Sequence, residues 1–186
     1  RVASLSRAQQ TEVFSGGDYL VAKVHDQMRL GQAGRALQSL DPERLSTLAQ
    51  SASSARSLAT DAAAYAGRMA ERAPGSARKL ADTLLKMARS AREQAPDDPE
   101  ARWALAHAQV ALVRTQRALG DKVKPDAFRE AADTLVGSYD VGAEDDGLAF
   151  VRAVEWLREG SALAAPAERT KLLDAAKGLV ARAKEK

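Results

Sequence analysis

The sequence predicts an all-α protein, and three observations support that prediction. Of the 186 residues, 40 are Ala, 21 are Leu and 19 are Arg, whereas Ile and Asn are absent. Ala, Leu and Arg rank high in helix propensity, while β-branched and aromatic residues favour strands. Apolar residues also recur at alternating steps of three and four, which is the helical period. Finally, an Asp-Pro-Glu helix start signal occurs twice, at residues 41–43 and 98–100.

The N-terminal elements are expected to be short. A helix over residues 3–14 ends at the glycine pair that follows Ser15. This pair is interpreted as a helix break rather than a phosphate-binding loop, because no strand precedes it. Asp18 then caps a second helix, which reaches Leu30. Residues 33–40 are expected to form one or two further turns, because two glycines interrupt the apolar pattern there.

Residues 41–73 are expected to form one helix of about 32 residues, because no proline follows the start signal until Pro74. Its apolar seam keeps alternating steps of three and four without interruption. The members of this seam are Leu45, Leu48, Ala52, Ala55, Ala59, Ala62, Ala66, Met69 and Ala73. A seam made mostly of alanine favours close approach of neighbouring helices. Between Leu45 and Thr60 the only charged residue is Arg56, so this helix is expected to pack on two sides.

Five more helices are expected in the rest of the chain. A Pro-Gly turn folds the helix over residues 76–95 back antiparallel along its predecessor. The helix over residues 99–119 is apolar on most of its surface, so it belongs in the middle of the fold. Of the last three helices, one opens at Pro125 or Asp126, one runs from the acidic loop of residues 140–147 to Ala162, and one opens at Pro166.

Three stretches after Ser76 have the spacing of a known helical repeat. Their residues are Ala91, Pro96, Pro99, Glu100, Ala101, Trp103, Leu105, Ala106, Ala131, Leu135 and Ser138. They resemble the end of one tetratricopeptide repeat (TPR), the start of the next repeat and a further second helix. The resemblance implies antiparallel helix pairs that stack as a right-handed array, or a helical bundle, and present a concave face to a protein or peptide partner.

The whole chain, residues 1–186, is expected to form a single all-helical domain of about seven or eight helices, because no linker rich in Gly, Ser or Pro divides it. Residues 1–95 form its long-helix half and residues 96–186 its TPR-like half. No apolar run approaches the ~18 residues of a membrane span, so the chain is expected to be soluble. The sequence begins with Arg1 rather than Met. This start is compatible with a cytoplasmic location and with export to the cell envelope followed by removal of a signal.

Catalytic and cofactor chemistry has little support in the sequence. The absence of Cys excludes disulfides, thiol catalysis and Cys-ligated metals. His25 is interpreted as a surface residue, and His107 as a hydrogen-bonded core or interface residue rather than a ligand. The acidic loop of residues 140–147 lacks the ligand spacing of a calcium site and is interpreted as a helix cap. No catalytic, metal or cofactor site is therefore expected.

The predicted function is binding of a protein or peptide partner, through a groove formed by the five C-terminal helices. Trp103, Tyr139 and Trp156 are the candidate anchors, because aromatic residues are enriched in binding hot spots. Trp156 is expected to be the most exposed of them, since its helical neighbours are charged. Arg89 and Arg92 are candidate electrostatic partners of the bound molecule.

Two other functions stay open. A helical bundle can bind a small apolar ligand or lipid, although an alanine seam packs too closely to leave much volume. A basic cluster at residues 68–92 can attract nucleic acid or an anionic surface. No aromatic residues alternate with its arginines and lysines for base stacking, and the net charge of the chain is only +3. Nucleic acid is therefore the less favoured partner.

Overall fold

The computed structural model describes residues 17–140 and 147–184 of the chain. Within these ranges it contains nine helices and no strand, which confirms the all-α prediction. The helices are α2 (Gly17–Arg29), α3 (Ala33–Ser39), α4 (Pro42–Ala49), α5 (Ala52–Arg72), α6 (Pro74–Gln94), α7 (Pro99–Ala118), α8 (Asp126–Asp140), α9 (Leu148–Ser161) and α10 (Pro166–Lys184). The helix expected over residues 3–14 and the loop residues 141–146 lie outside the described ranges.

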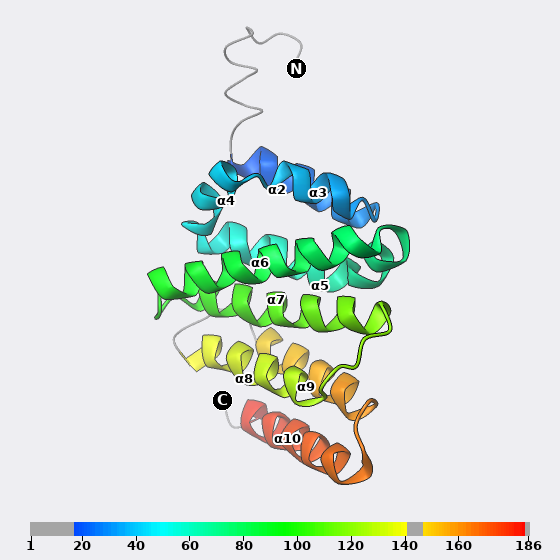
Figure 1. Cartoon of the computed structure of the whole chain (residues 1–186). Helices are drawn as coiled ribbons and strands as arrows, with labels where there is room; N and C mark the ends of the chain where they lie inside the picture. The colour runs from blue at the N-terminus through cyan, green and yellow to red at the C-terminus, as the bar shows by residue number, and fades with distance from the viewer. Residues whose placement is uncertain (1–16, 141–146, 185–186) are drawn as a thin grey trace, which may run out of the picture.

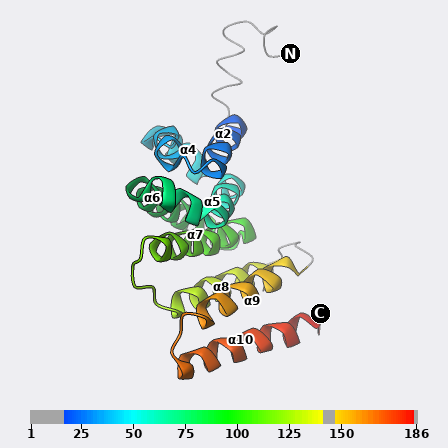
Figure 2. The same cartoon turned by 90° about the vertical axis from the view of Figure 1, so that its right-hand side faces the viewer.

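The helices stack in chain order, from α2, α3 and α4 at one end of the molecule to α10 at the other (Figure 1, Figure 2). The two helices α5 and α6 pack along each other in opposite directions, as the Pro-Gly turn predicts. The next helix, α7, packs against α5, α6 and α8, and ten of its residues are buried. The predicted place of residues 99–119 in the middle of the fold is therefore confirmed.

The prediction of one long helix over residues 41–73 is wrong, because the structure divides this stretch into α4 and α5. Ser51 has an extended backbone (φ −102°, ψ 103°), and its hydroxyl accepts a hydrogen bond from the Ser54 N–H at 3.3 Å. A serine cap of this kind starts a new helix without interrupting the apolar spacing on either side. The expected packing on more than one side holds for α5, which contacts α2, α6 and α7.

Two other helix starts have the caps that the sequence predicts. The Asp41 carboxylate accepts a hydrogen bond from the Arg44 N–H at 3.0 Å, and a proline follows as the first helical residue. The Asp98 carboxylate accepts a hydrogen bond from the Glu100 N–H at 2.8 Å, again with a proline next in the chain. Proline also opens α6 at Pro74, slightly earlier than expected, because its fixed φ suits the first helical position.

Small side chains let the central helices pack closely. The seam residues Ala59 and Ala62 of α5 are at most 1% exposed. They belong to a core that extends from α2 to Trp156 of α9. A second, smaller core joins α8 and α9 to α10. Because Leu172 and Ala176 are the buried residues of α10, much of that helix stays uncovered.

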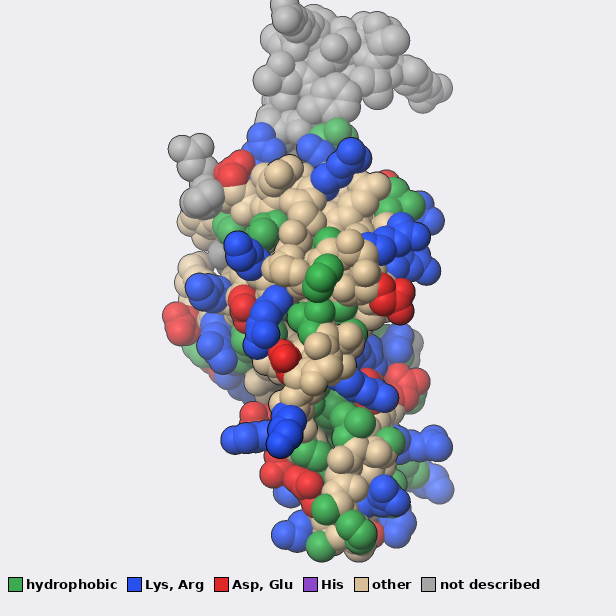
Figure 3. All heavy atoms as spheres, turned by 45° about the vertical axis from the view of Figure 1, so that its right-hand side comes forward, with side chains coloured by type: hydrophobic (Ala, Val, Ile, Leu, Met, Phe, Trp, Pro, Cys, Tyr) green, Lys and Arg blue, Asp and Glu red, His purple; other side chains and the backbone are tan. Residues whose placement is uncertain are grey.

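The exposed apolar side chains are concentrated near the C-terminal end of the stack. Five of the seven large apolar side chains exposed in the described ranges lie between Leu148 and Val180. Figure 3 shows one face of the molecule. On this face, apolar patches lie among Lys and Arg side chains and extend to the C-terminal end of the stack. A bilayer crossing needs about 18–20 consecutive apolar residues, and no described helix provides such a stretch.

Candidate functional site

The two tryptophans expected to anchor a partner lie in the interior. Trp103 is 3% exposed and Trp156 is 2% exposed. The expectation that Trp156 is the most exposed anchor is therefore wrong. Its charged neighbours Arg152 and Glu159 form ion pairs, while the indole ring meets His107 of α7 edge to face, with ring centres 4.9 Å apart. Burial by a neighbouring helix thus overrides the polar character of the adjacent turns.

These aromatic rings form a column that joins α5, α7 and α9. The rings of Trp103 and His107 stack with centres 5.2 Å apart and planes 10° apart, and Trp156 closes the column from α9. At the other end, the Arg56 guanidinium lies 4.1 Å from the Trp103 ring centre and also pairs with Glu100. Aromatic and cation–π contacts of this kind stabilise packed helices. The column therefore has a structural role rather than a role as partner surface.

Burial also decides the charge of His107. Its Nδ1 lies 3.1 Å from the backbone oxygen of Trp103. Because a carbonyl oxygen only accepts, Nδ1 carries the proton and donates a hydrogen bond to that oxygen. Removal from water lowers the pKa of His107 to about 3, and three nearby arginines add to that effect. The ring is neutral at pH 7, and the interpretation of His107 as a hydrogen-bonded core residue is confirmed.

His25 has a different environment, near the N-terminal end of the stack. Its side chain is 40% exposed, and its Nδ1 lies 2.5 Å from a carboxylate oxygen of Asp61. This contact joins α2 to α5, which gives the pair a structural role. Within the described residues, no group of three or more His, Asp or Glu side chains is arranged to hold a metal ion.

Of the other three candidate residues, only Arg89 and Arg92 have side chains that the structure describes, and both belong to α6. Tyr139 lies in the last turn of α8, and its side chain is outside the part of the chain that the structure describes. Arg89 is exposed on α6, whereas Arg92 is partly buried and donates a hydrogen bond to the backbone oxygen of Pro96. The described candidates divide between the surface of α6 and the interior around α7, so they do not form one site.

Several members of the basic cluster at residues 68–92 make contacts within the protein. Arg68 and Arg72 of α5 donate hydrogen bonds to backbone oxygens at the end of α2. Such contacts satisfy carbonyl groups that a helix leaves without partners at its last turn. Arg78 pairs with Asp121 at 3.0 Å. These three arginines therefore have partners within the fold.

The exposed residues of α6 carry both signs of charge. Lys79, Lys86 and Arg89 lie on one stripe with Asp82 and Glu93, at steps of three and four residues. Opposite charges at this spacing attract one another and reduce the field of the helix. Such a stripe is typical of a solvated helix face.

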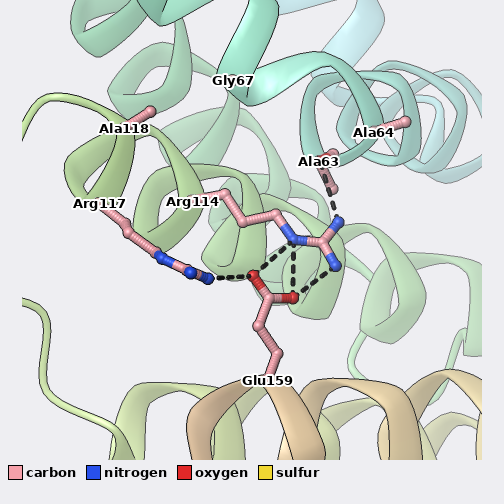
Figure 4. A pocket seen from close by; sticks show the side chains of 7 residues that line it. All are labelled: Ala63, Ala64, Gly67, Arg114, Arg117, Ala118 and Glu159. Carbon is pink, nitrogen blue, oxygen red and sulfur yellow. Dashed lines mark hydrogen bonds and ion pairs between the residues drawn. The ribbon is translucent and has the colours of Figure 1, made fainter. Parts of the chain in front are cut away.

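A cleft of about 420 Å³ lies between α5, α7 and α9 and contains a network of ion pairs (Figure 4). Arg114 donates hydrogen bonds to both carboxylate oxygens of Glu159, the shortest at 2.8 Å. It also donates to the backbone oxygen of Ala63 at 3.0 Å. Arg117 reaches Glu159 at 3.4 Å. We refer to this cleft, lined by Ala63, Ala64, Gly67, Arg114, Arg117, Ala118 and Glu159, as the arginine cleft.

The arginine cleft links three helices from within. Arg114 lies on α7, and its partners Ala63 and Glu159 lie on α5 and α9 (Figure 4). An acidic ligand would compete with Glu159, a carboxylate that is already bound to both guanidinium groups. A smaller cavity of about 110 Å³ beside the cleft reaches His107 and Trp156 and is large enough to hold water. The cleft is therefore best explained as a structural contact.

A second hollow, between α9 and α10, is mostly apolar. It consists of two adjoining cavities of about 440 and 340 Å³, which share Val154, Arg158 and Val180. We refer to both together as the outer groove. Its lining residues are Phe150, Val151, Val154, Glu155, Arg158, Leu173, Ala176, Lys177, Val180, Ala183 and Lys184. Val151 is 55% exposed and Val180 is 42% exposed, so the groove presents apolar side chains to solvent.

None of the residues that line the outer groove is among the predicted site residues, although α10 contains a signal for them. Leu172 and Ala176 form the buried stripe of this helix, whereas Leu173 and Val180 are exposed. Adjacent residues of a helix point about 100° apart, and the interface that buries Leu172 leaves Leu173 36% exposed. A second apolar stripe therefore predicts apolar surface beyond what one interface covers.

Comparison with protein-family models, with curated proteins and with solved structures finds no match to this chain. The resemblance to TPR proteins therefore stays a prediction.

Proposed function

We propose that this protein is a non-catalytic interaction module of the helical-repeat kind, which binds a helix of a partner protein in the outer groove. One observation carries the proposal: Val151, Leu173 and Val180 line the groove and are between 36% and 55% exposed. Contiguous exposed apolar surface marks interaction sites, whereas single exposed apolar residues are common on any protein. The groove therefore has the character of an interface.

The spacing of the groove residues fits a helical partner. On α10, the four apolar lining residues from Leu173 to Ala183 follow steps of three, four and three. This is the pattern of a helix face that packs against another helix. The fold itself contains a comparable arrangement, because α7 packs against both α5 and α6. A partner helix would cover α9 and α10 in the same way.

The polar sites support a binding role rather than catalysis. In the arginine cleft, Arg114 and Arg117 both pair with Glu159. His107 is buried, and its pKa of about 3 keeps it neutral at pH 7. General acid–base catalysis depends on an accessible group that titrates near the working pH, and these residues do not have that character.

A small apolar ligand or lipid is the alternative occupant of the outer groove. The volumes of about 440 and 340 Å³ are in the range of ligand sites. Ligand pockets, however, bury about 70–90% of the bound molecule. A lining residue as exposed as Val151 (55%) indicates a more open surface, which suits a helix better.

Selection from a library of helical peptides tests the proposal, followed by fluorescence anisotropy of the selected peptides. In Val151→Glu or Val180→Glu, a bound peptide would remove the new carboxylate from water. We therefore expect the affinity to fall by at least about tenfold. Leu30→Glu is the matched control, because Leu30 is 44% exposed and follows α2 at the other end of the stack. Failure to select any helix, or equal affinity in all four proteins, would refute the proposal.

A further inference from the structure

We infer that the partner helix is acidic, with Asp or Glu along the edges of its apolar face, opposite Arg158 of α9 and Lys184 of α10. This inference rests on the proposed function, because it assigns a chemical character to the helix that the outer groove binds. The observation behind it is the distribution of charge around the groove. Charge complementarity of this kind selects partners and accelerates association.

The rim of the outer groove is basic. Arg158, Lys177 and Lys184 line the groove together with a single carboxylate, Glu155, so the lining has a net charge of +2. Apolar side chains form the floor between these charges. A partner with an apolar face and flanking carboxylates would match both features, whereas a partner with flanking lysines would be repelled.

Two of the rim cations carry the uncompensated charge. Glu155 pairs within α9 at 3.2 Å, and Lys177 pairs within α10 at 3.0 Å. Arg158 and Lys184 are exposed and have no ion-pair partner among the residues that the structure describes. They are the groups that gain most from an incoming carboxylate.

The positions of these cations indicate where the acids of the partner would lie. Arg158 borders both cavities, so it stands midway along the groove on the α9 side. Lys184 ends α10 and follows Lys177 by two helical turns, or about 10 Å. A partner helix with acids about seven residues apart would meet both lysines, and an acid on its opposite edge would meet Arg158.

An anionic membrane is the other kind of surface that a basic and apolar face can bind. The shape of the outer groove favours a helix, because side chains that project from a rod can fill cavities of about 440 and 340 Å³. A bilayer would lie across the rim and leave the floor uncovered. The Glu155 carboxylate at that rim would also repel anionic headgroups.

Three peptides of about 18 residues with the same apolar face, and with Glu, Gln or Lys along its edges, test the inference by fluorescence anisotropy. We expect the Glu peptide to bind at least about tenfold more tightly than the Gln peptide, and to weaken as salt is raised. The double variant Arg158→Glu/Lys184→Glu should transfer the preference to the Lys peptide. The matched control Lys86→Glu/Arg89→Glu reverses two exposed charges on α6 and should leave the preference unchanged.

The outcomes separate this inference from the proposed function. If the Glu and Gln peptides bind equally and Val180→Glu abolishes both, the groove binds a helix but the acidic partner is wrong. If Glu-peptide binding is unaffected by Val180→Glu and by charge reversal at Arg158 and Lys184, the proposed function fails as well. Tighter binding to vesicles of phosphatidylcholine and phosphatidylglycerol than to the Glu peptide would overturn the inference in favour of a membrane surface.

Discussion

His107 is a base that folding keeps neutral. Burial lowers its pKa from 6.5 to about 3. Between these values the unfolded chain binds a proton that the folded protein does not bind. This proton uptake by the unfolded chain lowers the free energy of unfolding. The contribution of neutral His107 to stability is therefore fully present above pH 6.5 and is lost as the pH falls toward 3. We expect His107 to lower the free energy of unfolding by about 1.4 kcal/mol for each pH unit in this window.

Urea denaturation between about pH 7 and pH 4 measures this dependence. His107→Gln removes the titrating group, while its amide can still donate a hydrogen bond to the backbone oxygen of Trp103. The variant should therefore lose stability less steeply than the wild type as the pH falls. Equal slopes in the two proteins would contradict the assignment of a low pKa to His107.

Three glycines within helices differ in the space around them. A Cβ added to Gly67 or Gly178 meets nothing within 4 Å. At Gly160 it would lie 3.0 Å from the Cβ of Phe128 and 3.1 Å from the backbone oxygen of Pro125. Gly67→Ala and Gly178→Ala should each raise the free energy of unfolding by about 0.5–1 kcal/mol, because alanine restricts the unfolded chain. Gly160→Ala should lower it by about 1–3 kcal/mol in the same urea assay, and an increase would contradict the tight contact.

The sequence predicts the environment of His107 but not that of Trp156. His107 belongs to a helix that is apolar on most of its surface, and ten of the 20 residues of that helix are buried. On α9, charged residues lie one turn away from Trp156 on either side, yet the ring is 2% exposed and contacts His107 of α7. Helical spacing gives the direction of a side chain on its own helix, whereas burial depends on which helix lies opposite.

At the scale of helices, the junction between α4 and α5 depends on Ser51. Its hydroxyl accepts the Ser54 N–H, which otherwise has no partner in the first turn of α5. Ser51→Ala should therefore lower the free energy of unfolding by about 1 kcal/mol, measured by urea denaturation. The matched control is Ser53→Ala, at an exposed position, which should change it by less than about 0.5 kcal/mol. Equal effects of the two substitutions would rule out a specific contribution of the cap.

Helix boundaries are predictable where two signals coincide. Asp41 and Asp98 are each followed by proline, and each forms the predicted cap. Ser51 is one of several serines in a low-charge stretch, and the apolar seam continues through it. A cap changes the backbone of one residue but leaves the periodicity intact, so periodicity alone does not reveal it.

At the scale of the whole molecule, contacts between remote residues set the arrangement of the helices. Arg114 and Glu159 are 45 residues apart in sequence, and their contact joins α7 to α9. The sequence predicts both helices but does not show which of their charges meet. The sequence does not show which residues line the outer groove for a related reason, because they resemble core residues until the packing of α10 shows which stripe is covered.

The link between α7 and α9 is testable through Arg114 and Glu159. Arg114→Met leaves Glu159, 22% exposed, with only the long contact to Arg117, so the free energy of unfolding should fall by about 2 kcal/mol. Arg114→Met/Glu159→Met removes both charges and leaves only Arg117, which is 51% exposed, without its partner. It should cost less than the two single substitutions together, with a coupling energy of about 1–3 kcal/mol. Arg117→Met, at a residue 51% exposed, should cost less than about 0.5 kcal/mol in the same urea denaturation series. Additive effects of the two single substitutions would contradict an energetic link between α7 and α9.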